Sequence, residues 1–361
     1  MTPEQFARAT RVQGPADLHI GDRVIGRGPC FIIAEAGVNH NGNVDLARAL
    51  IDVAASAGVD AVKFQTFEPD LLASPEAPLA DYQRRCGGDE SQVAMLRRLV
   101  LPREAVEKLA TYAIGCGLVF LSTPFDHVSA DFLEQLDVAA FKVPSGEITN
   151  HDLLAHIARK GRPVLMSTGM CTLDEVAAAV RVVRVHGNPP LALLHCVTNY
   201  PAEPAECNLR AMDTMRDTFG LPVGWSDHTL SMSIALAAIA RGAPLIEKHF
   251  TLSRRLPGPD HAASLEPGEL VSLVRSGREI EAALGDGVKR PTSSELQIRP
   301  VVRRGLHLRH DLPAGSMLTA ADLVAVRPGS GIPLERLQMV IGRKLRVAVG
   351  RGRCLREEDL E

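Results

Sequence analysis

The stretch "LIEKHFTL", residues 245–252, sets three ionisable side chains in the middle of an apolar run. Burying a charge is costly unless the charge is paired, hydrogen-bonded or bound to a metal, so these residues indicate either a structural partner or a chemical role. In an extended segment successive side chains point to opposite faces. We therefore expect Glu247 and His249 to share one face, toward a site, and Lys248 to form a structural ion pair on the other.

A second histidine, His228 in "WSDHT", stands at the end of the preceding apolar run. Neutral imidazole is the commonest metal ligand in proteins, and two histidines would make an open site with room for water or substrate. Ligands from separate strands form no local motif, so the spacing alone leaves a metal site and two ordinary buried histidines equally open.

Two lysines, Lys63 in "VKFQTF" and Lys142 in "KVPSGE", suggest anion binding. Together with Ser145 and Ser167 they could clamp a dianionic phosphate through charge-assisted hydrogen bonds. The competing chemistry is a Schiff base, in which a lysine amine attacks a carbonyl group, as in an aldolase. Nearby carboxylates favour a protonated lysine over a free amine, and hence the clamp.

The elements that would position these residues are eight short apolar runs separated by helix-like segments. Segments such as "LARALIDVAASAG" and "TLDEVAAAVRVVRVHG" have apolar residues at helical spacing and a Gly near the end. Strands that alternate with helices predict parallel βαβ units, and eight such units predict a (β/α)8 TIM barrel. The predicted strands are residues 31–35, 60–66, 118–123, 139–143, 163–168, 191–197, 221–226 and 243–250.

In such a barrel the active site lies at the carboxyl ends of the strands. A single polar residue there is as readily explained by a structural ion pair or a satisfied buried histidine as by a site. The convergence of polar groups from nearly every strand is what predicts an active site. The residues concerned are Glu35, Lys63, Thr123, Lys142, Ser167, His195, Ser226, Asp227, His228, Glu247 and His249.

Two segments interrupt or precede the strand–helix alternation. Residues 18–28, "LHIGDRVIGRG", have the Gly-bounded pattern of a hairpin, which would plug the face opposite the site. The connection from 67 to 117 is longer than one crossover needs, so we expect residues 81–92, "DYQRRCGGDESQ", in a loop inserted over one barrel face.

The chain changes in character after about residue 290. Residues 311–323, "DLPAGSMLTAADL", and 348–360, "AVGRGRCLREEDL", align without gaps at an offset of 37 residues. Two copies are too few for a solenoid, so they predict a small pseudo-symmetric domain with short strands. We expect a barrel domain over 1–289 with its N-terminal hairpin, a linker over 290–300 and the small domain over 301–361.

Composition excludes several classes of function. The formal net charge of the 361 residues is -3, which gives no bulk electrostatic reason to bind nucleic acid. No apolar run approaches the roughly 18 residues of a membrane span, and no signal-peptide core is present. The seven cysteines are scattered and form no CxxC pair, which indicates a reducing compartment. We expect a cytoplasmic, soluble protein with no nucleic-acid or membrane partner.

At the polar strand ends the sequence closely resembles the sialic acid synthase family, which includes N-acetylneuraminate and N,N'-diacetyllegionaminate synthases. These enzymes condense phosphoenolpyruvate with an N-acetylated amino sugar. The resemblance runs from about residue 20 to the end and includes a C-terminal domain like the family's SAF, or antifreeze-like, domain. The motifs that carry it are "AEAGVNHNG", "VKFQTF", "STPFD", "KVPSGE", "STGM", "HCVTNYP", "WSDHT", "EKHFTL", "GPDHAASLEP" and "VRPGSG".

The resemblance implies a role for each matching position. His228 and His249 match ligands of a divalent metal, with Mn2+ expected and Mg2+ or Co2+ as alternatives. Glu35 matches the catalytic carboxylate, and Tyr200, Glu247 and Asp260 match positions around substrate and metal. Arg327 matches an arginine that the SAF domain delivers into a partner subunit's barrel to meet the N-acetyl group, which implies a domain-swapped homodimer. The residues that match phosphoenolpyruvate contacts are Lys63, Thr123, Lys142, Ser145, Ser167 and Ser226.

The activity first expected is therefore that of an N-acetylneuraminate synthase, which uses N-acetylmannosamine and releases phosphate. The alternative is an N,N'-diacetyllegionaminate synthase, which uses 2,4-diacetamido-2,4,6-trideoxymannose in the same chemistry. A pseudaminic-type enzyme is disfavoured by "GPDH" where that branch has "GPDA". Outside the enzymes, an inactive carbohydrate-binding protein would be favoured by loss of a lysine or histidine, and none is lost. Trp225 departs from many relatives and predicts a packing change.

Overall fold

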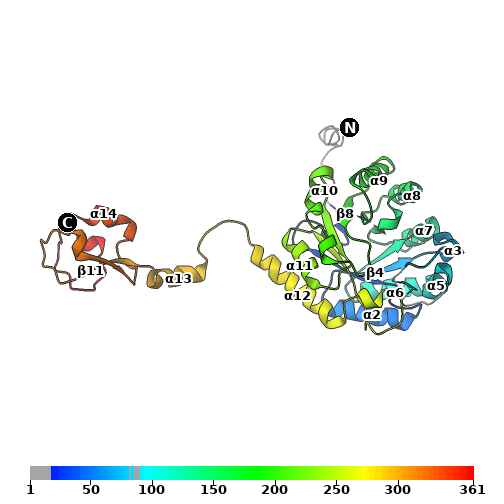
Figure 1. Ribbon diagram of the computed structural model, residues 1–361, viewed down its shortest axis with the longest axis horizontal. Coiled ribbons are helices and arrows are strands. Elements are labelled where there is room, and N and C mark those ends of the chain that lie inside the picture. The colour runs from blue at the N-terminus through cyan, green and yellow to red at the C-terminus, as the bar shows by residue number, and fades with distance from the viewer. Residues whose placement is uncertain (1–17, 81–82, 85–89) are drawn as a thin grey trace. The chain divides into compact units, whose positions relative to one another are not determined.

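The computed structural model describes residues 18–80, 83–84 and 90–361, and the chain divides into two compact units with a boundary between Gly285 and Asp286 (Figure 1). Each unit contains a hydrophobic core of its own. No helix in this described part of the chain is long and apolar enough to cross a membrane.

Eight parallel strands in the described part of the first unit close into a barrel. The last strand pairs with the first, and His249 stands beside Glu35 in that register. The (β/α)8 fold predicted from the alternating apolar runs is thus confirmed. The strands are β3 (Phe31–Gly37), β4 (Ala61–Thr66), β5 (Val119–Pro124), β6 (Phe141–Val143), β7 (Val164–Ser167), β8 (Leu191–His195), β9 (Val223–Asp227) and β10 (Leu245–His249).

Helices surround the barrel in Figure 1, and their ends follow local sequence signals. Helix α2 begins where the Asn43 side chain accepts backbone N–H groups and ends at Gly58, whose φ of 76° is left-handed. A capping box of Thr172 and Glu175 begins α9. The helices around the barrel are α2 (Val44–Ala57), α6 (Arg103–Gly115), α7 (His127–Gln135), α8 (His151–Arg159), α9 (Leu173–Val185), α10 (Ala211–Phe219), α11 (Met232–Ala240) and α12 (Pro267–Leu284).

Strand side chains alternate between two cores. In β3, Ile32 joins the core between strands and helices, whereas Phe31 and Ile33 join the core inside the barrel. The predicted hairpin, β1 (His19–Ile20) with β2 (Arg23–Val24), is confirmed, and its apolar residues pack into the inner core. It therefore closes the amino end of the barrel and leaves the carboxyl end, where Glu35 follows Ile33, for polar groups.

The long connection between β4 and β5 contains more than the crossover helix α6. It adds α3 (Pro69–Leu72) and α5 (Gln92–Leu99), which belong to a satellite core formed with Val38 and Phe67. Most of the loop expected over residues 81–92 lies outside the described residues. An insertion at this connection is confirmed by α3 and α5.

The second unit contains the antiparallel pair β11 (Gly305–Leu308) and β12 (Leu323–Val326) and the short helix α14 (Leu337–Val340). Its two sequence repeats form backbone hydrogen bonds with each other at equivalent positions. Leu312 and Val349, at equivalent positions, exchange backbone bonds of 3.0 and 2.9 Å. The equivalent residues Leu318 and Leu355 are both buried, so the pseudo-symmetric domain predicted from the repeat is confirmed.

The segment between the units, predicted as a linker over 290–300, contains the start of helix α13 (Ser293–Val302). Thr292 caps this helix through Glu295, and no residue of the helix is buried. The boundary between the compact units falls at Gly285 to Asp286, shortly before the predicted linker.

Candidate active site

A cavity of about 330 Å³ opens at the carboxyl ends of the barrel strands. It brings together all the barrel residues to which the family resemblance gives a role, although they come from separate strands and loops. The predicted residues that line it are Glu35, Lys63, Thr123, Lys142, Ser145, Ser167, Tyr200, Ser226, His228, Glu247, His249 and Asp260.

Lys63 lies at the centre of the charged side of this cavity. Its Nζ donates a 2.9 Å hydrogen bond to the Thr123 hydroxyl and lies 2.8 Å from Glu35 Oε2. The Glu35 oxygen forms an ion pair with Lys63 but no hydrogen bond with any described residue. Glu35 therefore retains an oxygen that can accept a proton or a hydrogen bond from a substrate.

Lys142, like Lys63, contacts a hydroxyl group and a carboxylate. Its Nζ donates a 2.7 Å hydrogen bond to the Ser167 hydroxyl. Glu247 lies between the two lysines, with Oε1 3.8 Å from Lys63 Nζ and Oε2 3.8 Å from Lys142 Nζ. Ser226 donates a 3.2 Å hydrogen bond to Glu247 Oε1. The buried carboxylate of Glu247 thus faces two buried ammonium groups. The local positive charge exceeds the charge of this carboxylate, and a bound anion would offset the excess.

Burial and charge act in opposite directions on these groups. Burial raises the pKa of Glu35 to about 7, although Lys63 opposes the shift. Burial also works to raise the pKa of Glu247, but Lys142 and Lys63 outweigh it and the pKa is lowered. Burial lowers the pKa of Lys142 in spite of Glu247, opposite to the effect expected from the carboxylates alone. Two carboxyls with divergent pKa values suit different tasks, one for proton transfer and one as a fixed charge.

Two histidines approach one another beside the lysines. The rings of His228 and His249 are 5.4 Å apart between centroids, and burial lowers the pKa of His228 to about 4 and that of His249 well below its usual value. Both imidazoles are therefore neutral at pH 7. His228 Nδ1 donates to the Val197 carbonyl at 2.6 Å, which leaves Nε2 as the acceptor, 3.1 Å from the Tyr200 hydroxyl.

These histidines fit a divalent metal in their chemistry. His249 Nδ1 is buried and has no hydrogen-bond partner among the described residues, which is costly for a structural histidine. The backbone bond to His228 fixes the tautomer, as is common for histidine ligands. Asp260 Oδ2 lies 3.9 Å from His249 Nδ1, and burial raises the pKa of Asp260 to about 6. The described residues contain no group of three such ligands, so water or substrate would complete the coordination.

Ser145, after the end of β6, contacts a neighbouring loop. Ser145 Oγ accepts the Gly169 N–H at 2.8 Å, between the "KVPSGE" and "STGM" loops. A Cβ on Gly169 would lie 3.0 Å from that oxygen and 2.1 Å from Thr198 Oγ1, so only glycine fits there without displacing its neighbours. The hydroxyl is thereby fixed at the rim of the cavity.

Two strand-end groups predicted by position, Asp227 and His195, do not line the cavity. Lys248 Nζ pairs with Asp227 Oδ2 at 2.9 Å, both fully buried, which confirms the structural ion pair expected for Lys248. His195 lies against Trp225 with ring centroids 5.2 Å apart, and its Nε2 is 3.0 Å from the Cys207 carbonyl. Trp225 is buried in the core between strands and helices and does not line the cavity, and the packing change predicted for it stays a prediction.

Several residues that line the cavity were not predicted from the sequence. Gln65 donates to Glu35 Oε1 at 3.3 Å, and its place two residues after Lys63 was the available signal. Helix α5 lines the cavity with Gln92, Met95, Leu96 and Leu99. Their spacing of three or four residues marks one helical face, but a pattern of that kind does not reveal what the face covers.

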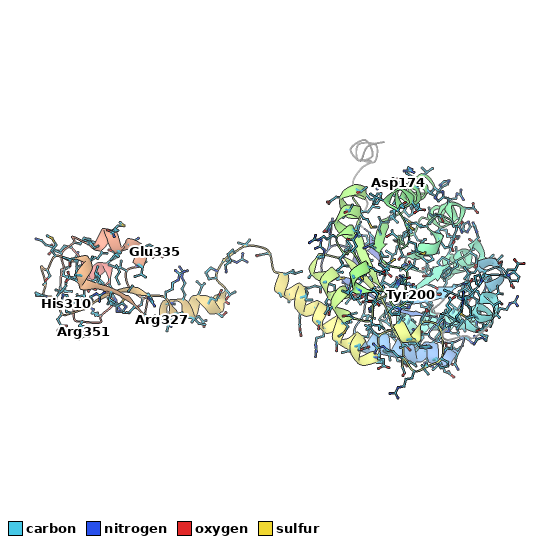
Figure 2. The ribbon with its side chains drawn as sticks, in the orientation of Figure 1. Asp174, Tyr200, His310, Arg327, Glu335 and Arg351 are labelled. Atoms are coloured by element: carbon cyan, nitrogen blue, oxygen red, sulfur yellow. The ribbon has the colours of Figure 1, made fainter. Side chains whose placement is uncertain are left out.

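Arg327 lies in the second unit, after β12, where Figure 2 labels it together with Tyr200 of the barrel. Its side chain is exposed, and it has no hydrogen bond or ion pair with a described residue. The cavity lining, in the part of the chain that the structure describes, contains no arginine. The role predicted for Arg327 therefore stays a prediction.

Comparison with known proteins gives matches over both units. A sequence model described as the NeuB family matches residues 50–289, and one described as the SAF domain matches residues 303–361. The N,N'-diacetyllegionaminic acid synthase of Legionella pneumophila is 46% identical over 337 residues, which are 92% of this chain and 95% of that protein.

Two further relatives extend the comparison. The N,N'-diacetyllegionaminic acid synthase of Campylobacter jejuni is 45% identical over 316 residues, 87% of this chain and 95% of that protein. The crystal structure of N-acetylneuraminic acid (sialic acid) synthetase from Leptospira borgpetersenii is 33% identical, with a TM-score of 0.69, and covers 79% of this chain and 96% of that one.

Proposed function

Because the chain belongs to the NeuB family and carries a SAF domain, we propose that it is an N,N'-diacetyllegionaminate synthase. The broader activity, that of a phosphoenolpyruvate-dependent nonulosonic acid synthase, follows from its relatives. The proposed reaction joins phosphoenolpyruvate to 2,4-diacetamido-2,4,6-trideoxymannose and releases phosphate. This conclusion reverses the order expected from sequence, which put N-acetylmannosamine first. The observation that carries it is the 46% and 45% identity to two N,N'-diacetyllegionaminic acid synthases over most of each chain.

The two lysines hold the anionic substrate. Phosphoenolpyruvate carries its charge on a phosphate and a carboxylate, and Lys63 and Lys142 present two ammonium groups on opposite sides of Glu247. The hydroxyls of Thr123 and Ser167, already bonded to these lysines, keep the ammonium groups oriented. A bound anion takes over part of the ion pairing that Glu247 makes with Lys63 and Lys142. Both lysines stay paired with a negative charge before and after binding, which favours binding.

His228 and His249 hold a divalent metal, for which we propose Mn2+, through neutral ring nitrogens. A bound metal would supply Lewis acidity, which polarises the aldehyde oxygen of the open-chain sugar. Tyr200, 3.1 Å from His228 Nε2, and Asp260, 3.9 Å from His249 Nδ1, lie beside these ligands and contact the sugar.

The reaction forms one carbon–carbon bond and breaks one carbon–oxygen bond. Carbon 3 of phosphoenolpyruvate attacks the aldehyde carbon, and the aldehyde oxygen takes up a proton to become a hydroxyl. Water adds to the cationic carbon 2, with Glu35 taking the water's proton. The carbon–oxygen bond to phosphate then breaks, the remaining hydroxyl gives its proton to the departing phosphate, and a ketone is left. Glu35 suits this task because its pKa of about 7 lets it hold and release a proton near neutral pH.

A partner subunit completes the sugar site in this proposal. The exposed Arg327 contacts the N-acetyl group of a sugar bound in the barrel of a second copy, so the enzyme works as a domain-swapped homodimer. Two observations support the idea: Arg327 has no partner among the described residues of its own chain, and the described cavity lining lacks an arginine. Arginine is suited to such contacts because its planar group carries several donors.

The test is phosphate release by the full-length protein supplied with phosphoenolpyruvate, Mn2+ and one sugar at a time. We expect kcat/KM for the diacetamido sugar to exceed that for N-acetylmannosamine by at least about tenfold, the discrimination that one or two apolar groups provide. A higher kcat/KM for N-acetylmannosamine would restore the N-acetylneuraminate synthase assignment.

A further inference from the structure

The cavity has an apolar side that the reaction chemistry does not use. Side chains from the loop after β3, from α3 and α5, and from the segment after β5 line this part of the cavity. These residues are Val38, Leu72, Met95, Leu96, Leu99 and Phe125. They also belong to the satellite core, and Met95, Leu96 and Leu99 are each no more than 9% exposed.

Helix α5 is fixed over the cavity at both ends. Ser91 caps its start by accepting the Ala94 N–H at 3.3 Å. At its end, a Cβ on Gly42 would lie 2.4 Å from the Arg98 carbonyl oxygen, so the loop after β3 approaches α5 at a distance that only glycine permits. Arg97 also pairs with Asp70 of α3 at 2.6 Å. The apolar face is thus a fixed wall and not a loosely packed loop.

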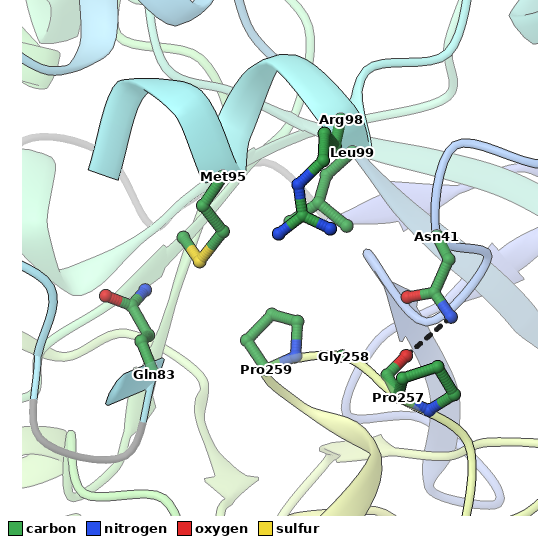
Figure 3. Close-up of a pocket in the computed structure, with 8 residues that line it drawn as sticks. All are labelled: Asn41, Gln83, Met95, Arg98, Leu99, Pro257, Gly258 and Pro259. Carbon is green, nitrogen blue, oxygen red and sulfur yellow. Dashed lines mark hydrogen bonds between the residues drawn. The ribbon is translucent and has the colours of Figure 1, made fainter. Parts of the chain in front are cut away.

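The same helix borders a second hollow, of about 260 Å³, shown in Figure 3. Met95 and Leu99 line both hollows, and so does Pro259, next to the site residue Asp260. In Figure 3, Met95 points from α5 toward Gln83 and Pro259. The hollow therefore continues the space beside the wall and can take a substituent longer than a hydroxyl.

We propose that Met95, Leu96 and Leu99 select the sugar by its far end. This inference rests on the proposed function, in which the aldehyde carbon reacts at the strand ends. The opposite end of the open-chain sugar then extends away from the lysines, to the wall of α5. The diacetamido sugar has a methyl group where N-acetylmannosamine has a hydroxymethyl group, and an acetamido group where it has a hydroxyl.

The wall discriminates because the side chains of Met95, Leu96 and Leu99 have no hydrogen-bonding group for a hydroxyl. The polar lining on this side comes from Gln83 and Gln92. A hydroxyl buried against Met95 and Leu99 would lose its water without gaining a partner, whereas a methyl group gains apolar contact. Differences of one small group in an apolar pocket change kcat/KM by about 10- to 200-fold. The second acetamido group needs additional space, which the hollow beside Met95 and Pro259 provides.

The test is the ratio of kcat/KM values for the two sugars in the full-length Met95→Gln enzyme. Glutamine has nearly the length of methionine but adds an amide, so we expect the ratio of the diacetamido sugar to N-acetylmannosamine to fall at least about tenfold. Met95→Leu, which keeps the site apolar, should retain the ratio within about threefold. The KM for phosphoenolpyruvate should stay unchanged in both variants.

Each outcome supports or contradicts the proposal. An unchanged ratio in a folded Met95→Gln enzyme would overturn it. Should Met95→Gln fail to fold, Met95→Ala removes atoms without adding a polar group, and it must raise the KM for the diacetamido sugar while leaving that for phosphoenolpyruvate unchanged. The wild-type ratio tests the proposed function separately: a wild-type preference for N-acetylmannosamine would refute that function, whereas an insensitive Met95 would refute only the role of the wall.

Discussion

The two sides of the cavity are built on different parts of the barrel. The charged side rests on strand ends, where Lys63, Lys142 and Glu247 are held by paired backbone and by one another. The apolar side rests on α5, part of an insertion between β4 and β5. Groups that must be placed accurately for chemistry stand on the rigid element, and groups that recognise a variable substituent stand on the added one. Changes on the first side should therefore affect every substrate, and changes on the second should affect only the choice of sugar.

The strongest test of the charged side is loss of the metal ligands. His228→Ala should lower kcat at least about a thousandfold with either sugar, because metal polarisation of an aldehyde stabilises the transition state by several kcal/mol. Chelation of the wild-type enzyme should have the same effect, and added Mn2+ should restore activity. Phosphate release with and without chelator measures both.

His195→Ala is a suitable control, since this strand-end histidine lies outside the cavity and should retain activity in a folded protein. Full turnover by a chelated enzyme shown to be free of metal would refute the metal site.

A smaller effect is expected when one lysine of the clamp is removed. Lys142→Ala should raise the KM for phosphoenolpyruvate by roughly 10- to 150-fold, because a charge-assisted hydrogen bond contributes about 1.5 to 3 kcal/mol. Steady-state kinetics with phosphoenolpyruvate as the varied substrate measures this. The KM values of the two sugars should change equally.

The Schiff-base chemistry is tested on the same residue. Burial lowers the pKa of Lys142, which favours the free amine that Schiff-base formation requires, so a covalent adduct should be looked for directly. Borohydride added with the amino sugar, whose open-chain aldehyde is the carbonyl that a lysine amine would attack, should give no covalent adduct by mass spectrometry. An adduct on Lys142 would replace the clamp with the aldolase mechanism. Lys248→Ala is the matched control: it breaks a buried ion pair with Asp227 and should lower stability by about 3 to 5 kcal/mol without selectively changing the KM for phosphoenolpyruvate.

Arg327 lies on neither side of the cavity, and it tests whether a second subunit contributes to the sugar site. Arg327→Ala should raise the KM for the sugar about tenfold and leave that for phosphoenolpyruvate nearly unchanged. Kinetics with each substrate varied in turn separates the two effects.

The same residue allows a test in trans. When Arg327→Ala and His228→Ala chains are refolded together, one of the two sites in a swapped dimer has an intact arginine and an intact histidine, so activity should return. Heterodimers that form and stay inactive would show that Arg327 does not act across subunits.

The smallest effect concerns pH. Burial raises the pKa of Glu35 to about 7, and Glu35 must be ionised to take a proton from water. The kcat at pH 7 should therefore be about half of its value at high pH, and it should decrease further as the pH falls below 7. The profile should be the same for both sugars. The histidines do not interfere, since the pKa of His228 is about 4 and that of His249 lies well below the usual value.

Asp260 is the competing titrating group, with a pKa raised to about 6. The inflection near pH 7 should therefore persist in Asp260→Asn and disappear from the residual activity of Glu35→Gln. Persistence in Glu35→Gln would assign the proton transfer to another group.

The sequence predicted the charged side far better than the apolar side, for physical reasons. Strand order and the carboxyl-end rule place Lys63 and Glu247 together without any side-chain detail. Which strand-end groups turn inward is harder to predict, because strands buried on both faces show weak alternation. Asp227 and Lys248 turn outward to one another, whereas Ser226 and Glu247 turn inward.

The wall of α5 could not be predicted because its position depends on contacts distant in sequence. The face formed by Met95 and Leu99 is visible as a helical pattern in "SQVAMLRRL". Its placement over the cavity depends on the approach of Gly42 to Arg98 and on the pairing of Arg97 with Asp70, neither of which has a local signal.

A crystal structure of the full-length enzyme with Mn2+, phosphoenolpyruvate and the open-chain reduced form of the diacetamido sugar would test the division of the cavity most directly. We expect the phosphate and carboxylate of phosphoenolpyruvate to contact Lys63 and Lys142, and the methyl group at the far end of the sugar to contact Met95 or Leu99. A sugar bound with its far end away from α5, in solvent or among the charged residues, would contradict the account.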